Sequence, residues 1–387
     1  MASAKETPLD VTAPEHPVHT RPDSACAGAE RGGPVGRQRH IHLREAALPG
    51  LLTILLVVVV LAAAIGPVPI APLVSAQIML NHTGLFHFAP AWPATDDVIL
   101  MQLRLPRVMG AALVGACLAV AGTLFQGLLR NPLADPLLLG TSSGAALGAT
   151  IAFVVPSLYA AQWLGFGFIS LLAFGGALVA VALVYRLARG GGKAPVVTLL
   201  LAGVAVGAIL TAIQTLLITL SNSFSLRIVA LYLWISGGVS VQSWSQIQVV
   251  FGITVCGVTG ALLLAPVLDA FALGEDMAQH VGVSTERAKI MIVGCASLLV
   301  AAAVSISGLV GFVGLVSPHL CRIVLGPRHR MLIPASALTG ATFVVLADVV
   351  ARTIASPNEL PLGIVTALVG GPFFLILLRR AGQGYSW

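Results

Sequence analysis

Charged residues are scarce in this sequence: they make up 9% of its 387 residues, against about 25% in an ordinary soluble domain. Aromatic residues are also few, at 6%, whereas 57% of the chain is hydrophobic. This composition leaves too little polar surface to keep a chain of this length in solution, and the mean hydropathy of +0.96 agrees. It excludes a soluble enzyme, a disordered protein and a nucleic-acid-binding protein, and it leaves a polytopic membrane protein.

Several chemical motifs are missing as well. The five cysteines form no C-x-x-C pair, so we expect neither a disulfide framework nor a metal site. No phosphate-binding loop is present, because the nearest stretch, 190–193, continues with Ala194 instead of Ser or Thr. We therefore expect no enzyme activity, no catalytic residues and no permanently bound cofactor. Acidic residues are absent from the middle of the apolar runs, which argues against an ion-coupled secondary transporter. That class, and a membrane-embedded enzyme or assembly protein, are the alternatives.

Apolar stretches of about 20 residues, the length of a membrane-crossing helix, follow a polar segment that spans residues 1–45. We expect residues 1–45 to be a disordered cytoplasmic tail, 46–380 to be the transmembrane domain and 381–387 to be a cytoplasmic end. The fold class predicted is an all-α polytopic membrane protein with ten transmembrane helices. The predicted spans are 47–68, 105–128, 137–156, 164–186, 195–220, 243–266, 288–307, 309–325, 331–355 and 360–378.

The basic residues indicate the orientation of these spans. With the N-terminus inside, 17 of the 21 Lys and Arg residues fall on the inner side, which predicts an N-in, C-in topology. Four basic residues remain outside: Arg104, Arg107, Arg227 and Arg352. Such outer arginines either attract an acidic partner or form local ion pairs, and Asp348 lies one helical turn before Arg352.

The inner segment 267–287 is the longest charged loop between spans. We expect it to form two short helices that end at Gly274 and Gly282, with Ser284 or Thr285 capping the next span. Two short helices at the membrane surface suit the docking of a cytoplasmic partner. A plain connector is the alternative interpretation.

Long motifs in this sequence resemble a known family. They are Arg104-Leu-Pro-Arg107 with the stretch that follows it to Ala149, GLVGFVGLVSPHLCRIVLG at 308–326, LADVVAR at 346–352 and ELPLGIVTALVGGPFF at 359–374. In this order they resemble the permease subunit of the importers for iron-siderophores, haem and cobalamin. The resemblance covers residues 46–380 and does not extend to the N-terminal tail.

The resemblance implies a ten-helix permease of the bacterial inner membrane that works as a homodimer. It implies two copies of a separate cytoplasmic ATPase, which bind and hydrolyse ATP, and a periplasmic binding protein that delivers the ligand. The family's docking arginines for that protein match Arg104, Arg107 and Arg352. The loop 267–287 matches the family's paired coupling helices. Its expected ATPase contacts are Leu273, Gly274, Glu275, Ala278 and Gly282.

The resemblance also bears on the cargo. It implies a channel lined in part by the fifth span, which offers the polar, uncharged residues Thr198, Thr211, Gln214, Thr215 and Thr219. Weak polar sites of this kind let a cargo pass without holding it. The overall likeness is closest to the haem importers, so haem, delivered by a periplasmic haem-binding protein, is the expected substrate. Ferric siderophores and cobalamin are the alternatives. Four spans of opposite orientation in each half suggest an inverted repeat, and small residues at Gly110, Gly115 and Gly122 suggest close helix packing.

Overall fold

The computed structural model describes residues 34–381, apart from 67, 85, 87, 90, 91, 160, 164, 165, 191–193, 222–225 and 242. The chain divides after Glu45 into an N-terminal segment and one compact unit. Residues 1–33 lie outside the described part, so the disorder predicted there stays a prediction. Helix α1 begins at Pro34, inside the segment that was predicted to be disordered and before the predicted start of the first span.

The compact unit is helical, with one two-stranded antiparallel hairpin, β1 (Gln162–Trp163) and β2 (Phe166–Gly167). Eight stretches of the described residues are long and apolar enough to cross a membrane. They lie in α1 (Pro34–Ala64), α3–η1–α4 (Ala94–Val98, Ile99–Arg104, Leu105–Leu129), α7 (Phe168–Ala188), α8 (Val196–Leu220), α10 (Trp244–Ala272), α12 (Thr285–Ser307), α14 (His329–Thr353) and α15 (Leu362–Ala381).

Two apolar helices are shorter: α5 (Thr141–Val154) and α13 (Val313–Leu325). With the eight long stretches they account for all ten predicted spans, but at 14 and 13 residues each is too short to cross about 30 Å of hydrocarbon alone. Ten full crossings therefore stay a prediction. The remaining helices were not predicted as spans: α2 (Pro72–His82), η2 (Pro136–Leu139), α6 (Pro156–Tyr159), α9 (Leu226–Ile235) and α11 (Glu275–His280).

Short polar signals set several helix boundaries. The Ser243 hydroxyl accepts the Gln246 N–H at the start of α10, and the Asp135 carboxylate accepts the Leu137 N–H at the start of η2. Each side chain satisfies a backbone donor that the first helical turn leaves without a partner. Ser284 occupies the predicted capping position of α12, but its side chain makes no capping hydrogen bond.

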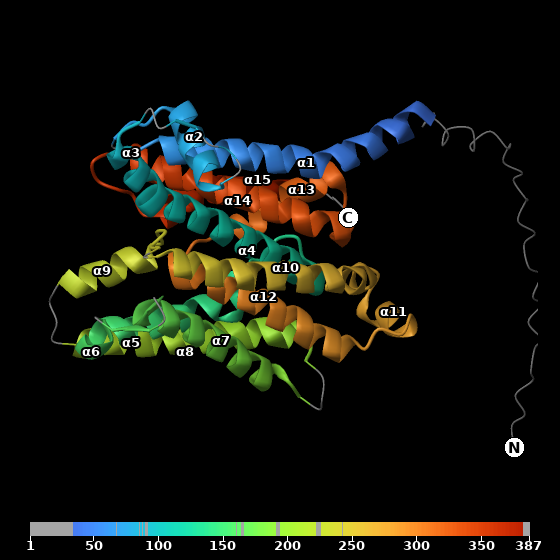
Figure 1. Cartoon of the computed structure of the whole chain (residues 1–387). Coiled ribbons are helices and arrows are strands. Elements are labelled where there is room, and N and C mark those ends of the chain that lie inside the picture. Colours follow the sequence, from blue (N-terminus) through green and yellow to red (C-terminus); the bar gives the residue numbers. More distant parts are fainter. Residues whose placement is uncertain are drawn as a thin grey trace, which may run out of the picture. The chain divides into compact units, whose positions relative to one another are not determined.

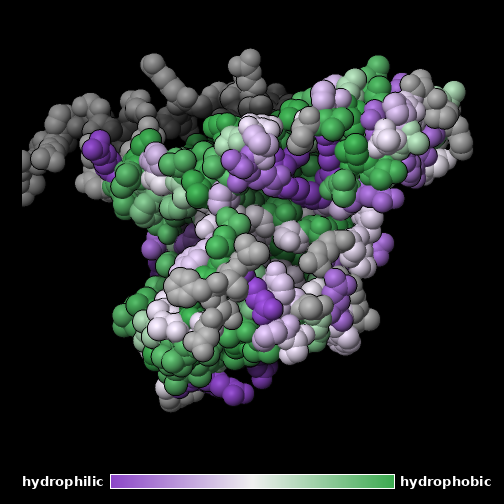
Figure 2. All heavy atoms as spheres, turned by 90° about the vertical axis from the view of Figure 1, so that its left-hand side faces the viewer, coloured by the Kyte–Doolittle hydropathy of each residue, from purple (hydrophilic) through white to green (hydrophobic). Residues whose placement is uncertain are grey.

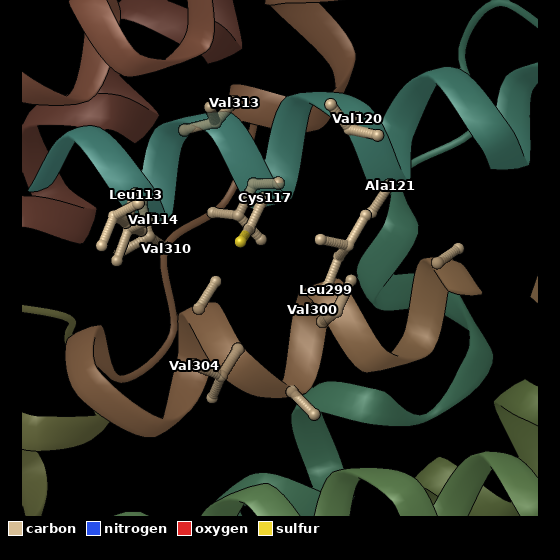
Figure 3. Close-up of a cluster of buried hydrophobic side chains, with 14 of the residues drawn as sticks. Leu113, Val114, Cys117, Val120, Ala121, Leu299, Val300, Val304, Val310 and Val313 are labelled. Atoms are coloured by element: carbon tan, nitrogen blue, oxygen red, sulfur yellow. The ribbon is translucent and has the colours of Figure 1, made fainter. Parts of the chain in front are cut away.

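Helix α4 lies at the centre of the compact unit, and 20 of its 25 residues are buried. Figure 3 shows Cys117 and Ala121 of α4 on the side of this helix that faces α12, in a cluster of buried hydrophobic side chains that includes Val300. The predicted close packing is confirmed at Gly115 and Gly122 of α4. A Cβ atom on the first would overlap the Gly340 carbonyl of α14, and on the second the Gly314 carbonyl of α13. Only glycine permits these backbones to approach so closely.

The two ends of the compact unit differ. Helix α11 and the end of α15 lie at one end, here called the α11 end, whereas α2, α3, α6 and α9 lie at the other, the α9 end (Figure 1). Arg130 follows α4 and lies against Gly274 at the α11 end, while Arg104 precedes α4 at the α9 end. Figure 2 views the α9 end, where hydrophilic side chains gather between flanking apolar surfaces.

Candidate functional sites at the two ends of the bundle

Arg104 and Arg352 are buried at the α9 end, with 7% and 8% of their surface exposed. The Arg104 guanidinium donates to the carbonyls of Ala63 (3.2 Å) and Ala64 (2.9 Å), and also to that of Val68. Arg352 donates to the carbonyls of Ala62 and Ile65, both at 3.2 Å. These carbonyls end α1 or follow it, where no intrahelical donor remains. The two arginines therefore fasten the end of α1 to the bundle.

Arg107 is the most accessible of the three predicted docking arginines, with 26% of its side chain exposed. Its Nε lies 3.1 Å from the buried Asp348 carboxylate, and its Nη2 lies 2.9 Å from the half-exposed Glu359. Asp348 also pairs with Arg352 at 2.9 Å, the local ion pair that was one of the two alternatives for this outer arginine. The structure therefore brings all three arginines to one end, where Arg107 is the most exposed and the N–H groups of the other two bind backbone carbonyls. The docking role of the three stays a prediction.

A cavity of about 420 Å³ lies beside Arg107, Asp348 and Glu359. Its wall includes the aromatic side chains of Phe153, Tyr159 and Trp234. The Arg227 guanidinium lies 5.3 Å from the centre of the Tyr159 ring, a cation–π contact that gives this fourth outer arginine a local partner. Sequence reasoning left Arg227 without a role, because the two residues are 68 positions apart.

The segment 267–287 differs from its prediction in one respect. Helix α10 continues to Ala272, so the segment contains one separate short helix, α11, and not two. The prediction ended the helix at Pro266, although the residues that follow are mostly apolar up to Ala272. Gly274 and Gly282 have φ values of +117° and +88° and bound α11 on either side. Both positions were predicted as breaks, and glycine adopts these conformations at little cost.

Three large apolar side chains are exposed at the α11 end: Leu273 (69%), Met277 (53%) and Val281 (65%). Met277 lies on α11, whereas Leu273 caps the end of α10 and Val281 follows α11, so the three flank and include this short helix. Ala278 is fully buried and Glu275 pairs with Lys289 at 2.5 Å, so these two predicted ATPase contacts are engaged within the chain. Sequence reasoning missed Met277 and Val281, although their regular spacing with Leu273 was a usable signal.

Helix α8 carries the predicted channel residues. Thr198, Thr211, Thr215 and Thr219 are exposed, and the last three follow one another at intervals of four. The residues Thr211, Thr215 and Thr219 are here called the threonine stripe. The hydroxyls of Thr215 and Thr219 donate to backbone carbonyls of their own helix, both at 2.9 Å, so these two side chains are polar but their donors are already paired. Gln214 is buried within the chain. A channel-lining role for it and for the threonines stays a prediction.

Among the described residues, no three His, Cys, Asp or Glu side chains are grouped to hold a metal ion. The buried His319 ring packs edge-on against Phe373, with 5.7 Å between ring centres. His329 pairs with Asp269 at 2.6 Å. Both histidines therefore have contacts within the fold that account for them without a metal ion.

Residues 54–380 match the model of the FecCD transport family, and the chain belongs to that family. It is 44% identical over 287 residues to the cobalamin import system permease BtuC of Halobacterium salinarum, covering 74% of this chain and 75% of that one. It is 39% identical over 310 residues to the hemin transport system permease HmuU of Yersinia pestis, covering 77% and 90%. A solved structure of a metal-chelate type ABC transporter in an inward-facing conformation is 29% identical, with a TM-score of 0.73 over 86% of this chain and 98% of that one.

These comparisons confirm the resemblance drawn from the motifs: the chain is a multi-pass ABC importer permease. They do not single out a substrate. Further relatives are named for ferric hydroxamate and ferric dicitrate, at 38% identity each. Haem therefore has no advantage over the other metal chelates on these grounds.

Proposed function

We propose that this chain is the permease subunit of an importer in which a separate ATPase drives a large metal chelate across the bacterial inner membrane. Two copies of the chain form a homodimer, two ATPase subunits bind its cytoplasmic face, and a periplasmic binding protein delivers the cargo. The observation that carries the proposal is the family match, which spans nearly the whole compact unit.

The α11 end is the cytoplasmic end in this proposal. Most basic residues of the compact unit belong to that end, as expected for a cytoplasmic face. The exposed residues Leu273, Met277 and Val281 supply an apolar contact surface there for the ATPase. Large apolar side chains exposed at a polar membrane boundary are typical of an interaction site.

The α9 end is then the periplasmic end. Arg107 and Glu359, which are paired and partly exposed, form the centre of the surface that receives the binding protein. Exposed charges of this kind set the register and the rate of association more than its strength. Arg104 and Arg352 support that surface from beneath through the end of α1.

The threonine stripe of α8 lines one side of the path, and its partner across the two-fold axis lines the other. Helix α8 suits such a position because most of its surface is left uncovered by its own chain. Only 17% of its most apolar 18-residue stretch is buried. Haem is the substrate favoured by the sequence, with ferric siderophore and cobalamin as alternatives of equal standing among the relatives.

Reconstitution in proteoliposomes tests this function. The chain is combined with its cognate ATPase and binding protein, and uptake of haem, a ferric hydroxamate and cobalamin is measured with internal ATP. We expect uptake of one cargo, and only when all three proteins are present. Uptake driven by a proton or sodium gradient with this chain alone would refute the proposal.

A further inference from the structure

Lys289, near the start of α12, is a buried cation with 1% of its side chain exposed. Its Nζ lies 2.5 Å from the Glu275 carboxylate of α11 and 2.9 Å from the Glu286 carboxylate of α12. The same Nζ donates to the carbonyl of Ala194 at 3.2 Å. One ammonium group thus joins α11, α12 and the segment that leads into α8.

The backbone at Ala194 is held from two directions. Its carbonyl accepts from Lys289, while its N–H donates to the second carboxylate oxygen of Glu286 at 3.1 Å. Pro195 follows with φ of −62° and directly precedes α8. The proline ring fixes that φ angle, so little rotational freedom separates Ala194 from the helix. The Lys289 cluster and the start of α8 are therefore joined through a single residue, Pro195.

Helix α11 is also tied closely to α12. The Val283 N–H donates to the Ala278 carbonyl at 3.0 Å across the turn between the two helices. The Gln279 amide donates to the hydroxyl of Thr285, the first residue of α12, at 3.1 Å. These two hydrogen bonds restrain the short turn. A displacement of α11 is therefore expected to move the start of α12, which carries Lys289.

The chemistry of this link favours a role beyond packing. The Lys289 ammonium is buried, whereas the Glu275 and Glu286 carboxylates are 38% and 28% exposed. Burial of the ammonium carries a desolvation cost that offsets part of its attraction to the two carboxylates, so stability alone does not favour it over a well-packed apolar side chain. What the ammonium group adds is geometry, because its three N–H donors bind three acceptors in defined directions. A methionine of similar length would fill the space without joining the three segments.

We propose that Lys289 is a positioning residue that transmits movement of α11 to α8 and so couples ATP hydrolysis to the channel. This rests on the proposed function, in which α11 contacts the ATPase and α8 lines the path. The partner is engaged by the exposed apolar side of α11, whereas the Lys289 cluster lies behind it within the chain.

The test compares Lys289→Met with a matched control, Arg287→Met, which removes an exposed positive charge two residues away. Both are purified with the ATPase and reconstituted with the binding protein. For Lys289→Met we expect the complex and its ATP hydrolysis to be retained within twofold, with uptake per ATP reduced at least tenfold. Arg287→Met leaves that ratio unchanged, and Lys289→Arg restores at least half of it.

Two further variants and readouts keep the outcome decisive. Glu286→Ala leaves Lys289 paired with Glu275 but frees the Ala194 N–H, and we expect uptake per ATP to fall at least threefold. Wild-type uptake per ATP in both Lys289→Met and Glu286→Ala would overturn the inference, as would loss of the ATPase complex from a correctly folded Lys289→Met. Failure of the wild-type chain to bind the ATPase would instead refute the proposed function.

Discussion

Replacing Arg104 by Met separates a structural role for this residue from a docking role. The substitution keeps most of the side-chain volume but removes the donors to three carbonyls at the end of α1. A hydrogen bond from a charged group contributes about 1.5–3 kcal/mol. Because water reaches part of this outer end, we expect a net loss of about 3 kcal/mol rather than the full sum. Figure 2 shows hydrophilic side chains gathered at this end of the bundle.

The assay pairs thermal unfolding of the detergent-solubilised permease with binding of the periplasmic protein to the folded fraction. For Arg104→Met we expect a lower unfolding midpoint and normal binding per folded molecule. Arg107→Met is the comparison variant, and there we expect weaker binding, more pronounced at low salt. An unchanged midpoint together with lost binding in Arg104→Met would refute the assignment of this arginine to α1.

Three further expectations follow from particular contacts. Gly115→Val forces a side chain into a backbone carbonyl of α14 and should lower the unfolding midpoint or prevent folding, whereas Gly175→Val, which meets nothing within 4 Å, should not; equal behaviour would contradict the packing described. Arg227→Met removes the contact with Tyr159 and should cost only about 0.5–1 kcal/mol, read from the same unfolding assay, with uptake unchanged. Asp276→Cys in a cysteine-free background should react with an impermeant maleimide only in inside-out vesicles, and labelling from the periplasm would reverse the topology.

The membrane class, the order of the apolar helices and the breaks at Gly274 and Gly282 could be predicted from the sequence. They follow from composition, run length and residues with special backbone freedom, which are local properties. The exact ends of helices could not, as α10 shows by continuing through Pro266 to Ala272. Proline inside a long apolar helix is tolerated when neighbouring helices hold the chain.

At the candidate sites, too, contacts between residues close in sequence could be predicted, whereas contacts between residues far apart in sequence could not. The pair of Asp348 and Arg352 could be offered as an alternative from the sequence because four residues separate the two on one helix. Burial of Arg104 was not, since its acceptors lie about 40 positions earlier in the chain. For the same reason Lys289 counted only as an inner positive charge. Its contact with Ala194 spans 95 residues, and no local pattern announces it.

The central position of α4 has a consequence for how this family can diverge. With nearly every face of α4 covered by other helices of its own chain, random replacement there meets a neighbour in each direction. In α8, only 17% of the most apolar 18-residue stretch is buried within its own chain, so a replacement there meets few neighbouring side chains. A saturation library scored by folding and membrane insertion of the chain should therefore tolerate apolar exchange along much of α8 and almost none along α4. New cargo preferences are then expected to arise on the sparsely covered helices, while the innermost one stays unchanged.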